Sequence, residues 1–189
     1  MFSCLFRKRR TSRYNHVFVL CTGRCGSVTF IEACQHITNY SSGHETRSGL
    51  IGDERLAYPT THIEADNRLS WLLGRLDQKY GDTAFYVHLT RDPEAVARSY
   101  AKRTRGIMAA YKGGGILMGC KEPDSLVVAR DYVHTVTSNI EHFLANKTHK
   151  MGFQLENAKD DFKRFVELTQ SECDLPSALA QFEIKHNAS

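Results

Sequence analysis

The sequence lacks any apolar run long enough to cross a membrane. The longest apolar stretch near the N-terminus, residues 17–21, has five residues, whereas a spanning helix needs about 20. Residues 1–6 are also too short for the apolar region of a secretory signal. We therefore expect no membrane span, and we expect a cytoplasmic protein.

Closely spaced cysteine pairs are also scarce. Six cysteines are scattered along the chain, at Cys4, Cys21, Cys25, Cys34, Cys120 and Cys173. This scatter favours reduced thiols over a disulfide framework. Only Cys21 and Cys25 lie near each other, and no second close pair completes a tetrahedral zinc set, so no metal site is expected.

Acidic residues are missing from the first thirteen positions, which carry five cations: Arg7, Lys8, Arg9, Arg10 and Arg13. The rest of the chain is nearly neutral, with 20 cations against 21 acids. This balance argues against a broad nucleic-acid-binding face. We expect a basic flexible tail over residues 1–14, with contact to phosphate or membrane surfaces as the weaker alternative. Residues 15–189 then form one globular domain of ordinary composition.

Apolar strand patterns alternate with helical patterns along this domain. Strands are expected at 16–22, 39–45, 60–65, 84–90 and 151–155, and helices at 28–37, 69–76, from Pro93, at 125–144 and at 162–168. Residues 46–58 read as a polar loop, and residues 104–123, with three consecutive glycines, as a mobile loop or lid. The alternation predicts an α/β fold: an open, mainly parallel sheet flanked by helices, with ligands beyond the carboxyl ends of the strands.

A glycine-containing turn joins the first expected strand to its helix. This turn, Gly23-Arg-Cys-Gly-Ser27, is suited to anions because glycines allow close wrapping and the helix N-terminus supplies N–H groups and positive potential. Arg24 adds a full charge. A simple tight turn is the alternative. A Walker A loop requires Lys and then Ser or Thr directly after its second glycine, whereas Ser27 and Val28 follow Gly26. Neither Cys21 nor Cys25 starts a Cys-x5-Arg loop.

A second candidate phosphate motif follows the strand at 84–90. It consists of Leu89-Thr-Arg91-Asp-Pro93, with Ser99 eight residues after Arg91. Arg91 stands where a strand gives way to a helix, so it can reach the crevice that the first turn faces. Taken alone, Arg91 fits a local ion pair or cap, and Ser99 fits a solvated helix position. Together with the first turn they suggest one cradle for each end of a nucleotide.

The two motifs, in this order and at this interval, resemble those of sulfotransferases that use 3′-phosphoadenosine 5′-phosphosulfate (PAPS). Cys21-Thr-Gly-Arg-Cys-Gly-Ser27 resembles their 5′-phosphosulfate loop, and His88-Leu-Thr-Arg-Asp-Pro93 with Ser99 their 3′-phosphate motif. The resemblance, closest to compact bacterial-type members, implies a P-loop-like sulfotransferase fold, PAPS as sulfate donor and no metal. The residues it assigns to the donor are Gly23, Arg24, Cys25, Gly26, Ser27, Val28, Arg91 and Ser99.

The resemblance also implies a catalytic role for Arg24 and a general base. Glu45, after the second expected strand, is the first choice because several carbohydrate sulfotransferases use a Glu from this region. His62 is the second, because Thr60-Thr-His62 resembles the strand that carries the base in the cytosolic enzymes. Glu64 and Asp66 are lesser options. The acceptor is a small molecule, carbohydrate or lipid, in a pocket expected from residues 46–58 and 104–123. A noncanonical nucleotide phosphotransferase and a non-catalytic nucleotide-binding protein remain the alternatives.

Overall fold

The computed structural model describes residues 12–184. Its centre is a sheet of five strands: β1 (His16–Leu20), β2 (Ser41–His44), β3 (His62–Ala65), β4 (Phe85–Thr90) and β5 (Lys150–Gln154). Every pairing is parallel, and the strand order is β2-β3-β1-β4-β5. The α/β class with a parallel sheet is thereby confirmed.

The pairing register decides which loops meet. Val19 of β1 pairs with Ala65 of β3, His44 of β2 pairs with the same Ala65, and Leu20 pairs with His88 of β4. The carboxyl ends of the strands therefore share one edge of the sheet, where ligands bind in folds of this kind. The turn after β1 is central on this edge, between the loops that follow β3 and β4.

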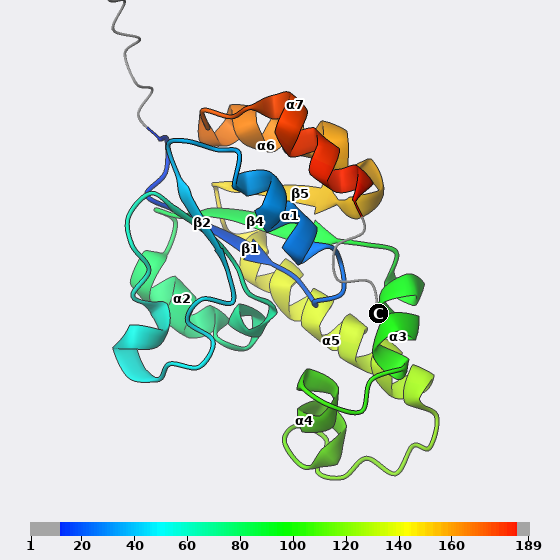
Figure 1. Cartoon of the computed structure of the whole chain (residues 1–189). Coiled ribbons are helices and arrows are strands. Elements are labelled where there is room, and N and C mark those ends of the chain that lie inside the picture. The colour runs from blue at the N-terminus through cyan, green and yellow to red at the C-terminus, as the bar shows by residue number, and fades with distance from the viewer. Residues whose placement is uncertain (1–11, 185–189) are drawn as a thin grey trace, which may run out of the picture.

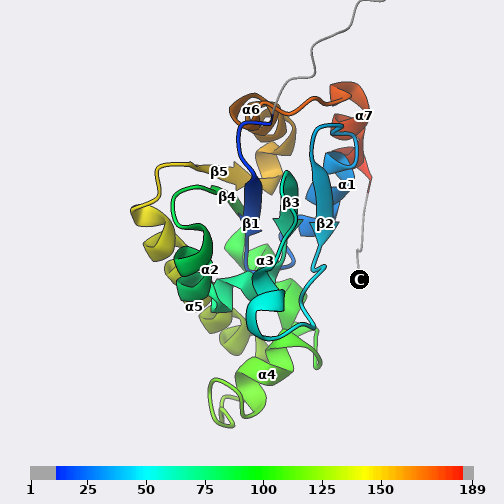
Figure 2. The same ribbon diagram turned by 90° about the vertical axis from the view of Figure 1, so that its left-hand side faces the viewer.

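Helices cover both faces of the sheet (Figures 1 and 2). One face carries α1 (Ser27–Cys34), α6 (Ala158–Thr169) and α7 (Leu175–Ala180). The other carries α2 (Leu73–Tyr80), α3 (Pro93–Ala101) and the long α5 (Ser125–Ala145). The short α4 (Ile107–Gly113) packs on α5 at one end of the molecule. Four short 3-10 helices complete the described part: η1 (Gly52–Leu56), η2 (Asn67–Trp71), η3 (Leu155–Asn157) and η4 (Gln181–Glu183).

Aromatic side chains fill the core on both faces. Between the sheet and α1 with α6, the ring of Phe30 makes edge contacts with Phe153, Phe162 and Phe165, at centroid distances of 5.0–5.8 Å. Phe18 instead faces the other layer and contacts Tyr58 and Tyr80. Each such ring removes a large apolar area from water, which fixes the helices on the sheet and so holds the loops at its carboxyl edge.

The structure corrects several sequence-based expectations. Residues 104–123 are not merely a surface loop, since they contain α4, whose Met108 and Tyr111 are buried. The polar loop 46–58 contains η1, and the expected helix at 69–76 is split into η2 and α2. Tyr14, assigned to the tail, is buried and packs against Phe85. Of the five cations of that tail, Arg13 is described, and the four at positions 7–10 lie outside the described residues.

Within residues 12–184, no helix combines the length and the apolar character that a membrane crossing requires.

Candidate nucleotide and transfer site

The turn between β1 and α1 has a backbone suited to binding an anion. Gly23, Arg24 and Gly26 all have positive φ, at 82°, 61° and 89°. Such left-handed residues turn neighbouring N–H groups toward one side and form a nest for negative charge. Gly26 is also the N-cap of α1 and provides no side-chain cap. The first N–H groups of α1, which have no acceptor within the helix, are thus left for a ligand.

Tight packing around the turn explains its two glycines. A Cβ at Gly23 would overlap the hydroxyl of Tyr100, and one at Gly26 would come within 2.6 Å of a methyl carbon of Leu155. Tyr100 and Tyr132 both donate a hydrogen bond to the Thr22 carbonyl, at 2.7 and 2.8 Å. These buried contacts fix the turn before any ligand arrives.

The second motif meets the first directly. Arg24 Nε donates to Ser99 Oγ at 3.0 Å, across 75 positions of the chain. Arg91 donates to the Arg24 carbonyl at 3.4 Å. Because β1 and β4 are neighbours in the sheet, the turn after β1 and the start of α3 lie side by side. The structure therefore brings together the predicted residues Arg24, Arg91 and Ser99.

Three guanidinium groups lie close together here, those of Arg24, Arg91 and Arg103. Burial, together with the positive charges of Arg103 and Arg91, lowers the pKa of Arg24 from its ordinary value. A guanidinium still keeps its proton at neutral pH. The side chains therefore concentrate positive charge beside the nest, and this arrangement favours a polyanion such as a nucleotide phosphate.

The two cysteines at the turn, Cys21 and Cys25, have buried thiols. A hydrogen bond with Cys25 and complete burial raise the pKa of Cys21 well above its ordinary value, so little thiolate forms at neutral pH. Cys25 is also fully buried. Cys25 lies in the turn, and Val28 lies in the first turn of α1. No group of three or more metal-binding side chains occurs within residues 12–184.

Ionisable side chains follow β2 and β3 at the same edge. His44, the last residue of β2, lies with Nε2 3.0 Å from Ser27 Oγ in the first turn of α1. The next residue, Glu45, adopts a left-handed φ of 54° and forms an ion pair with Arg68 at 2.6 Å. Glu45 therefore lies one residue from a side chain that contacts Ser27 at the start of α1.

His62 occupies the opposite end of its strand. It is the first residue of β3 and pairs in register with His16, at the start of β1. Its ring is buried between Ser41 and Glu64, at 2.8 and 2.9 Å. At about 3.3 Å of rise per residue, it lies roughly 10 Å from the carboxyl end of β3. The structure does not bring His62 to the turn.

A buried ion pair holds the end of β3. Arg55 of η1 contacts Asp66 at 2.5 Å, and the two side chains are only 5% and 0% exposed. Desolvation opposes the charge on Arg55, but Asp66 and Tyr58 outweigh it and raise the pKa of the guanidinium. Asp66 also accepts the Arg68 N–H at 2.8 Å and so begins η2. Asp66 thereby positions Arg68, the partner of Glu45.

Sequence reasoning gave no role to His44, Arg68 and Tyr100, and it named Asp66 only as a lesser candidate for the base. His44 was within reach of that reasoning, because it precedes Glu45 at the end of an expected strand. Asp66 carried a weaker signal, as a carboxylate directly after a strand. Tyr100 and Arg68 carried none, because their roles depend on packing against residues distant in sequence.

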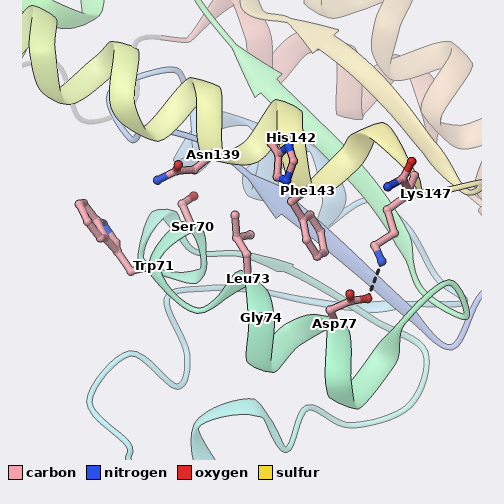
Figure 3. A pocket seen from close by; sticks show the side chains of 10 residues that line it. Ser70, Trp71, Leu73, Gly74, Asp77, Asn139, His142, Phe143 and Lys147 are labelled. Carbon is pink, nitrogen blue, oxygen red and sulfur yellow. Dashed lines mark hydrogen bonds and ion pairs between the residues drawn. The ribbon is translucent and has the colours of Figure 1, made fainter.

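A separate cavity lies away from these residues (Figure 3). It measures about 540 Å³ and is located between η2 with α2 and the C-terminal half of α5. Trp71 stands at one end, and the ion pair between Asp77 and Lys147 stands at the other. Arg24, Arg91 and Ser99 do not line it. Ser70 links the two regions, because its hydroxyl donates to the Cys21 carbonyl at 3.1 Å.

Comparison with known proteins supports the fold. No family model matches the chain, and neither does any curated protein. The crystal structure of mouse sulfotransferase SULT7A1 complexed with PAP is similar, with a TM-score of 0.59 and 14% sequence identity. The match covers 95% of this chain and 69% of the mouse chain. The chain has the sulfotransferase fold. At this level of identity, the similarity concerns the fold alone.

Proposed function

We propose that this chain is a PAPS-dependent sulfotransferase that transfers a sulfuryl group to a hydroxyl or amine of an acceptor. The observation that carries the proposal is the contact between Arg24 and Ser99, 3.0 Å apart, with Arg91 donating to the Arg24 carbonyl. One anion-binding turn and one cationic helix start are thereby joined. A nucleotide with separate 5′ and 3′ phosphate groups needs both, and the mouse sulfotransferase of the same fold was crystallised with PAP.

The residues of the turn fit the donor's 5′ end. The positive-φ nest, the uncapped start of α1 and Arg24 all provide donors for anionic oxygens. Arg91 and Ser99 are assigned to the 3′-phosphate. When bound, the donor supplies a sulfuryl group: a new bond forms between sulfur and the acceptor oxygen or nitrogen, and the bond from sulfur to the 5′-phosphate oxygen breaks.

Arg24 and the amides of Gly26 and Ser27 stabilise the negative charge that grows on the departing phosphate oxygen. Preorganised donors of this kind lower a barrier by about 3–4 kcal/mol each. Glu45 accepts the proton that the acceptor loses. Arg68, 2.6 Å from this carboxylate, orients it. The products are then a sulfated acceptor and 3′-phosphoadenosine 5′-phosphate (PAP).

We place this reaction in the cytoplasm. The five cysteines between residues 12 and 184 form no disulfide, which accords with a reducing compartment.

Calorimetric titration tests the proposal. PAP is expected to bind more tightly than adenosine 5′-phosphate or ATP with magnesium, because only PAP engages both cradles. Arg91→Ala removes one charged contact and is expected to weaken PAP about 10- to 100-fold. The matched control is Arg164→Ala, an exposed arginine on α6, which leaves the affinity unchanged.

Two results contradict the proposal. Equal affinity for PAP and adenosine 5′-phosphate means that no 3′-phosphate site exists, and preference for ATP with magnesium then favours a nucleotide phosphotransferase. Tight PAP binding without transfer to any acceptor favours a non-catalytic nucleotide-binding protein.

A further inference from the structure

A second cavity adjoins the anion-binding turn. It measures about 450 Å³ and is enclosed by the end of α3, by α4 with the segment after it, and by the start of α5. Tyr100 belongs to both regions, because it lines this cavity while its hydroxyl bonds to the Thr22 carbonyl. Arg103 also lines the cavity and lies close enough to lower the pKa of Arg24. A molecule in this cavity is therefore next to the proposed transfer site.

The lining combines apolar walls with positive charge. Met108 and Val128 are buried and contribute apolar surface. Arg103 and Lys112 contribute cations, and no aspartate or glutamate lines the cavity. Lys112 is half-buried and forms no ion pair with any carboxylate of residues 12–184.

The surrounding chain reinforces this charge. Residues 95–121 contain six lysines and arginines and no acidic residue. The same stretch exposes the apolar side chains of Ile116 and Met118 after α4, to 51% and 88%. Cations suit an acidic group, and exposed apolar side chains beside a cavity suit a ligand with an apolar body.

We propose that this cavity binds the acceptor, and that the acceptor is an anionic amphiphile: a molecule with an apolar body, an acidic group and a free hydroxyl. The inference rests on the proposed sulfotransferase function. Lys112 pairs with the acidic group, Met108 and Val128 contact the apolar body, and the hydroxyl is directed past Tyr100 toward the turn.

Cys120 provides a direct readout of occupancy. Its thiol is half-buried and lines the cavity, whereas Cys21, Cys25 and Cys34 are fully buried. Iodoacetamide alkylation of each cysteine is followed by peptide mass spectrometry in the presence of PAP. The probe is 12-hydroxydodecanoate. At about ten times its dissociation constant, it is expected to slow Cys120 alkylation roughly tenfold, because only the free fraction reacts.

Cys173 serves as the internal reference. It is half-buried outside the cavity, where burial raises its pKa to about 11. Its slow alkylation is expected to be the same with and without the probe.

Two comparisons test whether the acidic group of the ligand pairs with Lys112. Methyl 12-hydroxydodecanoate keeps the chain and the hydroxyl but has no charge, and it is expected to protect Cys120 more weakly than the acid. Lys112→Gln is expected to weaken protection by the acid about fivefold, as expected for one partly exposed ion pair. Protection by the ester stays unchanged in this variant. The matched control is Lys121→Gln, an exposed lysine that does not line the cavity.

The outcomes separate this inference from the proposed function. If the acid leaves Cys120 alkylation unchanged while calorimetry shows PAP binding, the function stands and the assignment of the cavity is overturned. If acid and ester protect equally, and Lys112→Gln changes neither, the anionic class is overturned. If the acid protects selectively but PAP does not bind, the cavity's ligand class stands and its role as a sulfuryl acceptor falls.

Discussion

The carboxyl edge of the sheet has two halves that are built differently. On the side of β1 and β4, Arg24, Arg91 and Ser99 meet around a turn fixed by neutral hydrogen bonds from Tyr100 and Tyr132. On the side of β2 and β3, ion pairs position the groups: Arg55 with Asp66, and Arg68 with Glu45.

This difference matches the two tasks in the proposed reaction. Holding a polyanion requires fixed positive charge that does not vary with pH, which guanidinium and N–H groups provide. Moving a proton requires a group that titrates, which carboxylates and histidines provide. The half around β1 and β4 therefore fits binding, and the half around β2 and β3 fits proton transfer. Variants that damage one half and spare the other test this division.

The largest effect is expected from Glu45→Gln. This change removes the proposed base but preserves the size of the side chain. Turnover is expected to fall by about 10²- to 10⁴-fold, the usual contribution of general base catalysis, while PAP affinity stays unchanged. Steady-state kinetics with an acceptor, together with calorimetry, measure the two quantities separately.

Glu32→Gln is the matched control, because Glu32 is an exposed glutamate on α1. Its turnover is expected to equal that of the unaltered chain. Near-normal turnover in Glu45→Gln would eliminate Glu45 as the base, and a loss of PAP affinity in that variant would show that the two halves are not separable.

The two halves also differ in how far their residue contacts could be predicted from the sequence. Arg24 and Arg91 were predictable as neighbours because each follows the end of a recognisable apolar strand, and parallel strands align their carboxyl ends. Glu45 was chosen by resemblance, and nothing in the sequence indicated Arg68 as its partner. The pair depends on β2, whose four residues Ser41–His44 have little apolar pattern. Likewise, α4 lies in a stretch rich in glycine, where tertiary packing of Met108 and Tyr111 overrides weak helix propensity.

The next effect concerns stability on the side of β2 and β3. Arg55→Met leaves Asp66, which is 0% exposed, as a buried carboxylate without its cation. Removing one partner of a buried pair is expected to lower the free energy of unfolding by about 3–5 kcal/mol. Urea unfolding measures this loss. Below the unfolding transition, PAP affinity is expected to remain normal, because the turn after β1 keeps its hydrogen bonds from Tyr100 and Tyr132.

A second change tests the cause. In Arg55→Met/Asp66→Asn the buried charge is gone, while the amide oxygen still accepts the Arg68 N–H. Much of the lost stability is expected to return. If Arg55→Met alone is as stable as the unaltered chain, the buried pair of Arg55 and Asp66 does not hold this half together.

The smallest effect is expected on the melting temperature, from the loss of an exposed ion pair on the side of β1 and β4. Arg130 and Arg98 lower the pKa of Glu94 to about 2, chiefly through the hydrogen bond from Arg130, which joins α3 to α5. A carboxyl whose pKa is lowered on folding stabilises the protein above its ordinary pKa of 4.5, and this contribution is lost as the pH falls toward 2. Glu94→Gln is therefore expected to lower the melting temperature slightly at pH 7 and less at pH 3. Thermal melts at both pH values, with Glu32→Gln alongside, measure the difference. If the difference in melting temperature between Glu94→Gln and the unaltered chain stays constant or widens at pH 3, the charge of the Glu94 carboxylate is not what joins α3 to α5. The contrast between an exposed ion pair on this side and a buried one on the side of β2 and β3 would then not hold.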